Sequence, residues 1–247
     1  MLKIEYFECF RAALEALPHK DQYEQSDLIS EQFSLFTEKN LKAYYAPFHY
    51  MNRKARVVLV GLTPGWTQMH GAFCAAKRGM ANGLKGDDLF QFIETSSSFS
   101  GTMRPILEGM LNGIGLHKCL GIDSCSDLFA GANDLVHFTS VVSAPIFKAG
   151  KNYTSSSARQ LLGLAPFRSF ILDNFAKEIG LLPEAVIVPL GKVADEVTAF
   201  LRDENIVRAE RCLIGFPHPS GANGHRKPLF EAGRARWSQQ VATFFRG

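Results

Sequence analysis

The sequence has few cysteines, and none of them has the spacing that cysteine-based sites require. Its 247 residues include five cysteines, an odd number without a Cys-x-x-Cys pair. That usage argues against a disulfide framework and against a standard zinc site, and it is typical of proteins from a reducing cytoplasm. We therefore expect a cytoplasmic protein without a standard zinc site.

Long hydrophobic runs are also missing. No apolar stretch approaches the roughly 20 residues that a membrane-spanning helix needs. The segment Met1-Leu2-Lys3-Ile4-Glu5 is quickly charged and amphipathic, which is unlike a signal peptide. The sequence thus predicts no association with a membrane.

Several common catalytic motifs are absent as well. The chain contains no Gly-x-Ser-x-Gly, no P-loop and no Gly-x-Gly-x-x-Gly after a strand, which weakens the hypothesis of an unrelated α/β hydrolase or nucleotide enzyme. It also contains no internal repeat, low-complexity tract or linker. We therefore expect one domain over residues 1–247, with residues 1–50 as a helical N-terminal extension packed on it.

Acidic residues are missing from one region in particular. The net charge is only +3, but residues 41–80 carry six Lys or Arg side chains and no Asp or Glu. Residues 201–247 carry eight basic and four acidic side chains. This basic surplus flanks two turns rich in glycine and proline, and it fits either a phosphate-binding surface or ordinary solvated charge.

Apolar runs separated by helical patterns define the expected fold. Strands are predicted at 55–60, 135–142, 185–191 and 211–216, and helices at 3–17, 25–39, 87–94, 105–113, 167–179, 192–201 and 229–245, with a loop-rich segment over most of 61–85. Strands without polar alternation are typical of a sheet covered on both faces. The pattern predicts an α/β fold with three layers, α/β/α, around a central four-stranded parallel sheet, plus N-terminal helices.

Three shaped loops follow the carboxyl ends of these strands. They cover residues 61–66, 143–153 and 216–227, and the first and last contain the Gly/Pro turns. Ligands of parallel sheets bind beyond the carboxyl ends of the strands, so we expect the three loops to converge. The aromatic-rich segment 44–50 is irregular, and sealing the core is favoured over stacking on a ligand.

Two motifs at these strand ends resemble the uracil-DNA glycosylase superfamily. The first is Gly61-Leu62-Thr63-Pro64-Gly65 and the second is His218-Pro219-Ser220. The resemblance runs from about Val57 to the C-terminus. It implies a monofunctional DNA glycosylase of base-excision repair, which hydrolyses the bond between deoxyribose and a uracil, or a related damaged pyrimidine, flipped out of DNA. Such an enzyme would use no cofactor and no metal.

The resemblance also implies a role for each motif. His218 matches the histidine that stabilises negative charge on the leaving base, although a histidine that caps the turn is the structural alternative. Thr63, or a nearby main-chain group, would hold the attacking water. The first motif would form one wall of the base pocket with Gly61, Leu62, Pro64 and Gly65. Thr139 or Ser140 would contact the base, and Trp66 or Phe73 would stack on it, with core packing as the alternative for both aromatics.

DNA is the partner that the resemblance implies, single- or double-stranded and carrying a damaged base. Ser220 matches a residue that grips phosphate, and the turn after it resembles the loop that enters the gap left by the flipped base. The expected DNA-binding residues are Ser220, Gly221, Ala222, Asn223, Arg226 and Lys227, joined by Lys148 and Lys151 of the loop 143–153. The protein is expected to act as a monomer.

The sequence departs from the family pattern at Thr63. Many members have aspartate or asparagine there, whereas a threonine carries no charge and holds water less firmly. His70, Asp87 or Asp88 are candidates for a substitute base. The pair Cys119-x5-Cys125 does not reproduce the spacing of the superfamily's iron–sulfur branches, so no cluster is expected. Loss of a water-positioning residue also leaves open a non-catalytic nucleic-acid or nucleotide-binding protein on the same fold.

Overall fold

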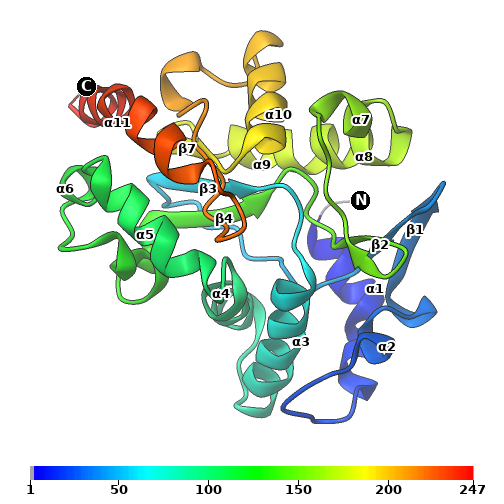
Figure 1. Ribbon diagram of the computed structural model, residues 1–247. Helices are drawn as coiled ribbons and strands as arrows, with labels where there is room; N and C mark the ends of the chain where they lie inside the picture. The colour runs from blue at the N-terminus through cyan, green and yellow to red at the C-terminus, as the bar shows by residue number, and fades with distance from the viewer. Residues whose placement is uncertain (1–2, 247) are drawn as a thin grey trace.

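Helices surround two separate sheets in the computed structural model, which describes residues 3–246 (Figure 1). The longer helices are α1 (Lys3–Ala16), α3 (Trp66–Ala81), α4 (Gly86–Ser97), α5 (Met103–Gly113), α10 (Lys192–Asp203) and α11 (Arg226–Phe244). The shorter ones are α2 (Gln25–Leu28), α6 (Leu116–Leu120), α7 (Ala158–Leu162), α8 (Ala165–Phe170) and α9 (Ala176–Gly180), with a π-helical turn Ile171–Phe175 between α8 and α9. The chain is therefore a mixed α/β protein, as predicted.

Three parallel strands form the central sheet. They are β3 (Val57–Gly61), β4 (Val136–Ser140) and β7 (Val186–Pro189), in the order β4-β3-β7. Strand β3 is buried along its whole length, which explains its continuous apolar sequence, because helices cover both faces of a parallel sheet. The parallel sheet at the heart of the fold is thus confirmed for three of the predicted strands.

The fourth parallel strand, predicted over 211–216, is not formed as a strand. A 3₁₀ helix (Ala209–Arg211) precedes it, and Cys212 makes only an isolated parallel bridge to Ile187. The amide of Leu213 donates to the carbonyl of Ile187 at 2.9 Å, but Gly215 then adopts a φ of +84°. The segment lies beside β7 in the expected position, yet this turn stops the ladder after one rung.

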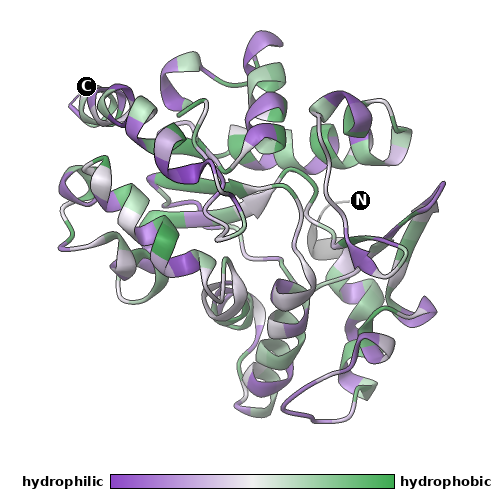
Figure 2. Cartoon of the chain, in the orientation of Figure 1, coloured by the Kyte–Doolittle hydropathy of each residue, from purple (hydrophilic) through white to green (hydrophobic). Residues whose placement is uncertain are grey.

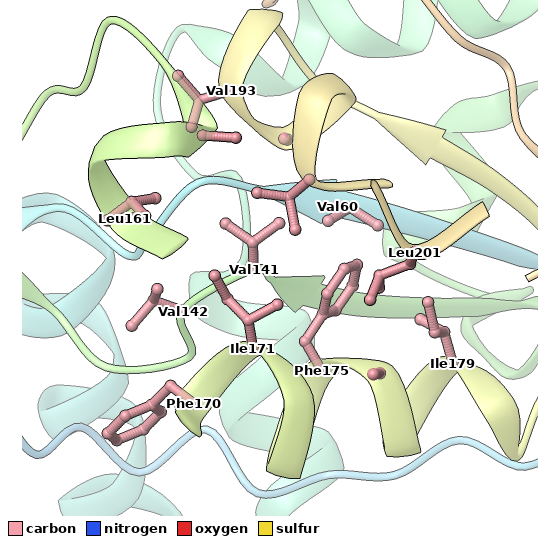
Figure 3. Close-up of a cluster of buried hydrophobic side chains, with 14 of the residues drawn as sticks. Val60, Val141, Val142, Leu161, Phe170, Ile171, Phe175, Ile179, Val193 and Leu201 are labelled. Carbon is pink, nitrogen blue, oxygen red and sulfur yellow. The ribbon is translucent and has the colours of Figure 1, made fainter. Parts of the chain in front are cut away.

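Two hydrophobic cores fill the space between the central sheet and its helices. On one face, Val58 and Val60 pack against residues of α7 to α10; Figure 3 shows Val60 with Phe175, Ile179 and Leu201 in this cluster. On the other face, side chains of α5, α6 and α11 cover the sheet. Figure 2 shows both hydrophobic and hydrophilic residues along α10, as expected for a helix with one buried side.

The N-terminal region contains an antiparallel sheet that the sequence did not predict. Its strands are β1 (Ser34–Glu38), β2 (Leu41–Tyr44), β5 (Ile146–Lys148) and β6 (Lys151–Asn152), in that order. The predicted helix over 25–39 is therefore wrong beyond α2, and residues 1–50 are not a purely helical extension. Strand β1 pairs with β2 in a hairpin, and β2 in turn pairs with β5, about a hundred residues away in the predicted loop 143–153.

Helix α3 occupies most of the segment that was predicted to be rich in loops. Two glycines of this helix allow close packing against α4. A Cβ on Gly79 would lie 2.7 Å from Cδ1 of Leu89, and one on Gly71 would lie 3.3 Å from Cβ of Ser97. Met69, Phe73 and other apolar residues of the helix are buried.

Candidate active site

A cavity of about 530 Å³ opens at the carboxyl ends of β3, β4 and β7. All three predicted loops contribute to its wall, so their convergence at this edge is confirmed. Its lining comprises Phe48, Gly61, Leu62, Thr63, Pro64, Gly65, Gln68, Glu94, Ser98, Phe99, Met103, Phe138, Thr139, Ser140, Ser143, Asn152, Tyr153, Thr154, Ser155, Leu190, Gly191, Lys192, Val193, Ala194, His218 and Ser220. The volume is in the range of pockets that hold small organic ligands.

Two glycines keep this cavity open. A Cβ on Gly61 would lie 3.2 Å from Oγ of Ser140 and 3.8 Å from Cε1 of Phe99. Gly191 has a φ of +90°, and a Cβ there would lie 2.9 Å from Cβ of His218. Because only glycine tolerates both that φ and that approach, Gly191 lets the His218 loop lie directly against the end of β7.

The hydrogen bonds of His218 fix its tautomer. The backbone N–H of Ser220 donates to Nδ1 of His218 at 3.1 Å. An N–H can only donate, so Nδ1 must be the acceptor and the proton of the neutral ring lies on Nε2. Burial lowers the pKa of His218 below its ordinary 6.5, because desolvation penalises the charged form. Within residues 3–246, no protein atom hydrogen-bonds Nε2, so this wall of the cavity carries a neutral N–H donor without a protein partner.

Thr63 ties its loop to the loop that follows β4. Its hydroxyl donates to the carbonyl of Ala144 at 2.5 Å. The proton of this hydroxyl is therefore engaged, while the oxygen keeps lone pairs that can accept a hydrogen bond from a water. Thr63 follows the central strand β3, and His218 follows the segment that lies beside β7. Both residues line the same cavity.

Neighbouring residues at the end of β4 have different environments. The hydroxyl of Thr139 donates to Oε2 of Glu178 at 2.9 Å, and Oε1 of Glu178 lies 2.6 Å from Nε2 of His137. Side chains alternate between the faces of a strand, so Ser140 lies on the opposite face from Thr139. Its Oγ is the atom close to Gly61, which makes Ser140, rather than Thr139, the residue whose hydroxyl is available to a ligand.

Neither aromatic residue predicted to stack on a base lines the cavity. Phe73 is fully buried, and its ring centroid lies 4.8 Å from that of Phe33, so core packing was the correct alternative for it. Trp66 packs beside His70, 5.6 Å between centroids. The sequence reasoning missed Phe99, which lines the cavity with a φ of +50°. That φ is unusual for a bulky residue and is often found at functional sites.

Of the predicted DNA-binding residues, Ser220 is the one that lines the cavity. Gly221 and Ala222 are exposed in the turn after it, and the side-chain amide of Asn223 donates to the carbonyl of His218 at 3.2 Å. Arg226 donates to the carbonyl of Ser220 at 2.5 Å. The lysines Lys227, Lys148 and Lys151 are exposed, the last two on the β5–β6 hairpin.

The candidates for a substitute base do not reach the cavity. His70 accepts a hydrogen bond from the amide of Tyr23 at 3.0 Å, and Asp87 and Asp88 are exposed in the first turn of α4. The carboxylate that does line the cavity is Glu94, also on α4, which the sequence reasoning missed. The available signal was its position on the buried face of that helix, one turn after Phe90.

Metal ligands and membrane spans were searched in the same part of the chain. Among residues 3–246, no three His, Cys, Asp or Glu side chains are grouped closely enough to hold a metal ion. The five cysteines are free thiols. No helix in this range combines the length and the hydrophobicity that crossing a membrane demands.

The fold and cavity define an α/β protein with a ligand-sized site at the carboxyl edge of a parallel sheet. No model of a known protein family matches the chain, and no solved structure matches it. The chain is 34% identical over 223 residues to the uncharacterized protein YoxB of Bacillus subtilis (strain 168), an alignment that covers 89% of this chain and 86% of YoxB. The chain belongs to the same family as YoxB.

Proposed function

We propose that this protein is a DNA glycosylase of the uracil-DNA glycosylase superfamily, which hydrolyses the N-glycosidic bond of uracil or a related damaged pyrimidine. The single observation that carries the proposal is His218, held as a neutral Nε2–H donor in the wall of a base-sized cavity. A neutral donor placed where negative charge develops is what the departure of a pyrimidine anion needs.

The reaction would divide among residues of the cavity wall. The bond between C1′ and the base breaks, and its electron pair leaves with the base as negative charge that the Nε2–H of His218 stabilises. Water adds to C1′ and gives up a proton to solvent, while Thr63 accepts a hydrogen bond from that water. Phe99 offers its ring for stacking, and Ser140 offers a hydroxyl to the base edge.

DNA would approach the mouth of the cavity as the partner of a monomeric enzyme. A base must leave the duplex stack to enter the cavity, and the strand beside it carries phosphates. Lys192 lines the mouth at the start of α10, and Lys148, Lys151 and Lys227 are exposed around it. These lysines, with Ser220, would contact the phosphates and supply the salt-dependent part of the affinity.

A second candidate is a binding protein that uses the same cavity without catalysis. One observation favours it: position 63 has no carboxylate, and the Thr63 hydroxyl already donates to Ala144. Incubation of the pure protein with oligonucleotides that each carry one altered base, followed by mass spectrometry of the released base, separates the two. A free base and an abasic strand support the glycosylase, whereas binding without release from any oligonucleotide supports the binding protein.

Replacing Thr63 by valine should lower kcat about fivefold without a matching change in affinity for DNA, because a hydrogen bond to the attacking water is worth about 1 kcal/mol. Valine keeps the shape of threonine but offers no oxygen. Thr63→Ser is the matched control and should retain most of the activity. Single-turnover rates and equilibrium binding, measured side by side, check this; equal rates for the valine variant and the wild type would remove Thr63 from the mechanism.

The pH dependence should reflect the buried state of His218. Its folded pKa lies below the ordinary 6.5, so the ring stays neutral at pH 7 and takes up a proton only as the pH falls below 6.5. We expect kcat/KM to be constant above that value and to fall on its acid side. Stability should also fall there, because the unfolded chain protonates this histidine first. A pH–rate profile with an acid limb above 6.5 would contradict this assignment.

A further inference from the structure

The peptide group that joins Ile214 to Gly215 is held at both of its ends by side chains of two helices. Its carbonyl accepts hydrogen bonds from the guanidinium of Arg236 at 2.6 Å and from the indole N–H of Trp237 at 3.0 Å, both on α11. Its N–H donates to Oδ1 of Asp195 on α10 at 2.5 Å. Because a peptide group bonded at both its donor and its acceptor rotates only by breaking these bonds, the direction of the chain is fixed here.

Little conformational freedom separates this peptide group from the ring of His218. Gly215 turns the chain with a φ of +84°. Phe216 is buried, and its carbonyl accepts a hydrogen bond from the N–H of Gly191 at 3.0 Å. Pro217 follows, and its ring fixes φ. The place of the imidazole in the cavity therefore depends on the direction that the chain takes three residues earlier.

Helix α10 contacts the His218 segment at two points that are one helical turn apart. Gly191, the N-cap, lies so close to the histidine that a Cβ there would be 2.9 Å from Cβ of His218. Asp195 holds Gly215, and its own N–H donates to the carbonyl of Gly191 at 3.0 Å. The first turn of the helix thus ties the two contacts together as one rigid unit.

Asp195 is a half-buried carboxylate, and its main interaction is with this peptide group. Burial raises the pKa of Asp195 above its ordinary 3.8 by desolvation, and the hydrogen bond from Gly215 acts in the opposite direction. A carboxylate is costly in such a position unless it accepts hydrogen bonds. Asp195 does not line the cavity, so any effect on a ligand must pass through the segment that it holds.

We propose that Asp195 is a positioning residue, which holds the amide of Gly215 and thereby sets where the Nε2–H of His218 points in the cavity. As a statement about the reaction, this inference rests on the proposed glycosylase function, whereas the placement of the ring does not. Loss of the carboxylate should loosen the segment and let water reach the imidazole. It should also weaken the donor that faces the leaving base.

An NMR titration of His218 in the full-length protein tests the positioning without any substrate. In Asp195→Ala the pKa of His218 should rise by about 0.5 or more toward the ordinary 6.5, because a loosened ring becomes hydrated. Loss of the negative charge by itself would lower this pKa, so a rise reports the loosened ring. Asp195→Asn keeps an oxygen that accepts from Gly215 and should leave the pKa at or below its wild-type value.

Asp203→Ala is the matched control for this titration. It removes a carboxylate from the last residue of the same helix, where the side chain is 66% exposed, and the pKa of His218 should not change. A pKa that is unchanged in Asp195→Ala, or that rises equally in Asp195→Asn, overturns the proposal. In the second case the charge near the start of the helix, and not the hydrogen bond, would be what matters.

A double-mutant cycle tests whether Asp195 acts through His218 in the reaction. Asp195→Ala should slow single-turnover base release from a uracil-containing oligonucleotide about tenfold, with little change in affinity, because a misplaced group stabilises the transition state less well. In the His218→Ala background the same change should slow release by less than about twofold, since no ring is left to position. Equal factors in the two backgrounds would show that Asp195 acts by another route and would overturn the proposal.

Two provisions keep the test decisive. If Asp195→Ala does not fold, as judged by its thermal melt, Asp195→Ser takes its place with the same expected outcomes, since its hydroxyl is polar but too short to reach the amide of Gly215. If the wild type releases no base from any oligonucleotide, the glycosylase proposal is wrong. The titration of His218 then still decides whether Asp195 positions the ring.

Discussion

Replacing His218 by alanine should lower the rate of base release by about 10²- to 10³-fold, the loss expected when one preorganised donor to a developing anion is removed. The ring makes its Nδ1 contact within its own loop, to Ser220, and offers Nε2–H to the cavity. Its removal should therefore affect the transition state far more than the ground state. Single-turnover excision at saturating protein measures the chemical step, and fluorescence anisotropy with the same oligonucleotide measures binding.

His225 provides the matched control for this variant. It is an exposed histidine in the same loop, and it does not line the cavity. His225→Ala should excise the base at nearly the wild-type rate. If His218→Ala loses affinity for DNA and keeps its single-turnover rate, His218 is a binding residue and the proposed stabilisation of the leaving base is wrong.

Replacing Glu178 by alanine should destabilise the protein by about 3–5 kcal/mol, because it leaves the buried polar groups of His137 and Thr139 without this hydrogen-bond partner, at about 1–3 kcal/mol each. Its carboxylate bridges His137 and Thr139 of β4 in a core that contains Val58 and Val60 of the central strand. For a chain of this size we expect the melting temperature to fall by about 6–20 °C, at 2–4 °C per kcal/mol. Differential scanning calorimetry measures the shift.

Two further variants serve as controls for the Glu178→Ala measurement. Glu184→Ala changes a carboxylate whose side chain is 79% exposed, and it should leave the melting temperature nearly unchanged. The triple change of Glu178 to leucine, His137 to leucine and Thr139 to valine removes all three polar groups together. It should cost less than the single change, since His137 and Thr139 then leave no buried polar group without its hydrogen bond. A single variant as stable as the wild type would show that the network contributes nothing to the fold.

Local sequence predicted those parts of the fold that depend on local hydrophobicity. The run Val57–Gly61 could only be a doubly covered strand, and its confirmation follows from the burial of every residue. The antiparallel sheet was not predicted, in part because β2 pairs with β5, about a hundred residues further along the chain. The prediction of a fourth parallel strand was wrong because the backbone turns at Gly215. The positive φ of this residue depends on its surroundings and not on its own sequence alone.

The sequence likewise predicted some residues of the site and missed others. Thr63 and His218 were found because glycine and proline mark shaped turns at strand ends, and strand ends of a parallel sheet meet. Glu94 and Phe99 were missed because neither follows a strand of the sheet. Glu94 reaches the cavity from α4, and Phe99 reaches it from the loop that follows α4. Their placement depends on how α3 packs against α4 through Gly71 and Gly79, which no spacing in the sequence reveals.

A crystal structure of the His218→Ala variant with a uracil-containing oligonucleotide tests the central claim most directly, namely that this cavity receives a base extruded from DNA. We predict the uracil inside the cavity, its ring against Phe99 and its sugar at the mouth beside Thr63. A uracil that remains stacked in the DNA, with the cavity occupied by water alone, would contradict the account.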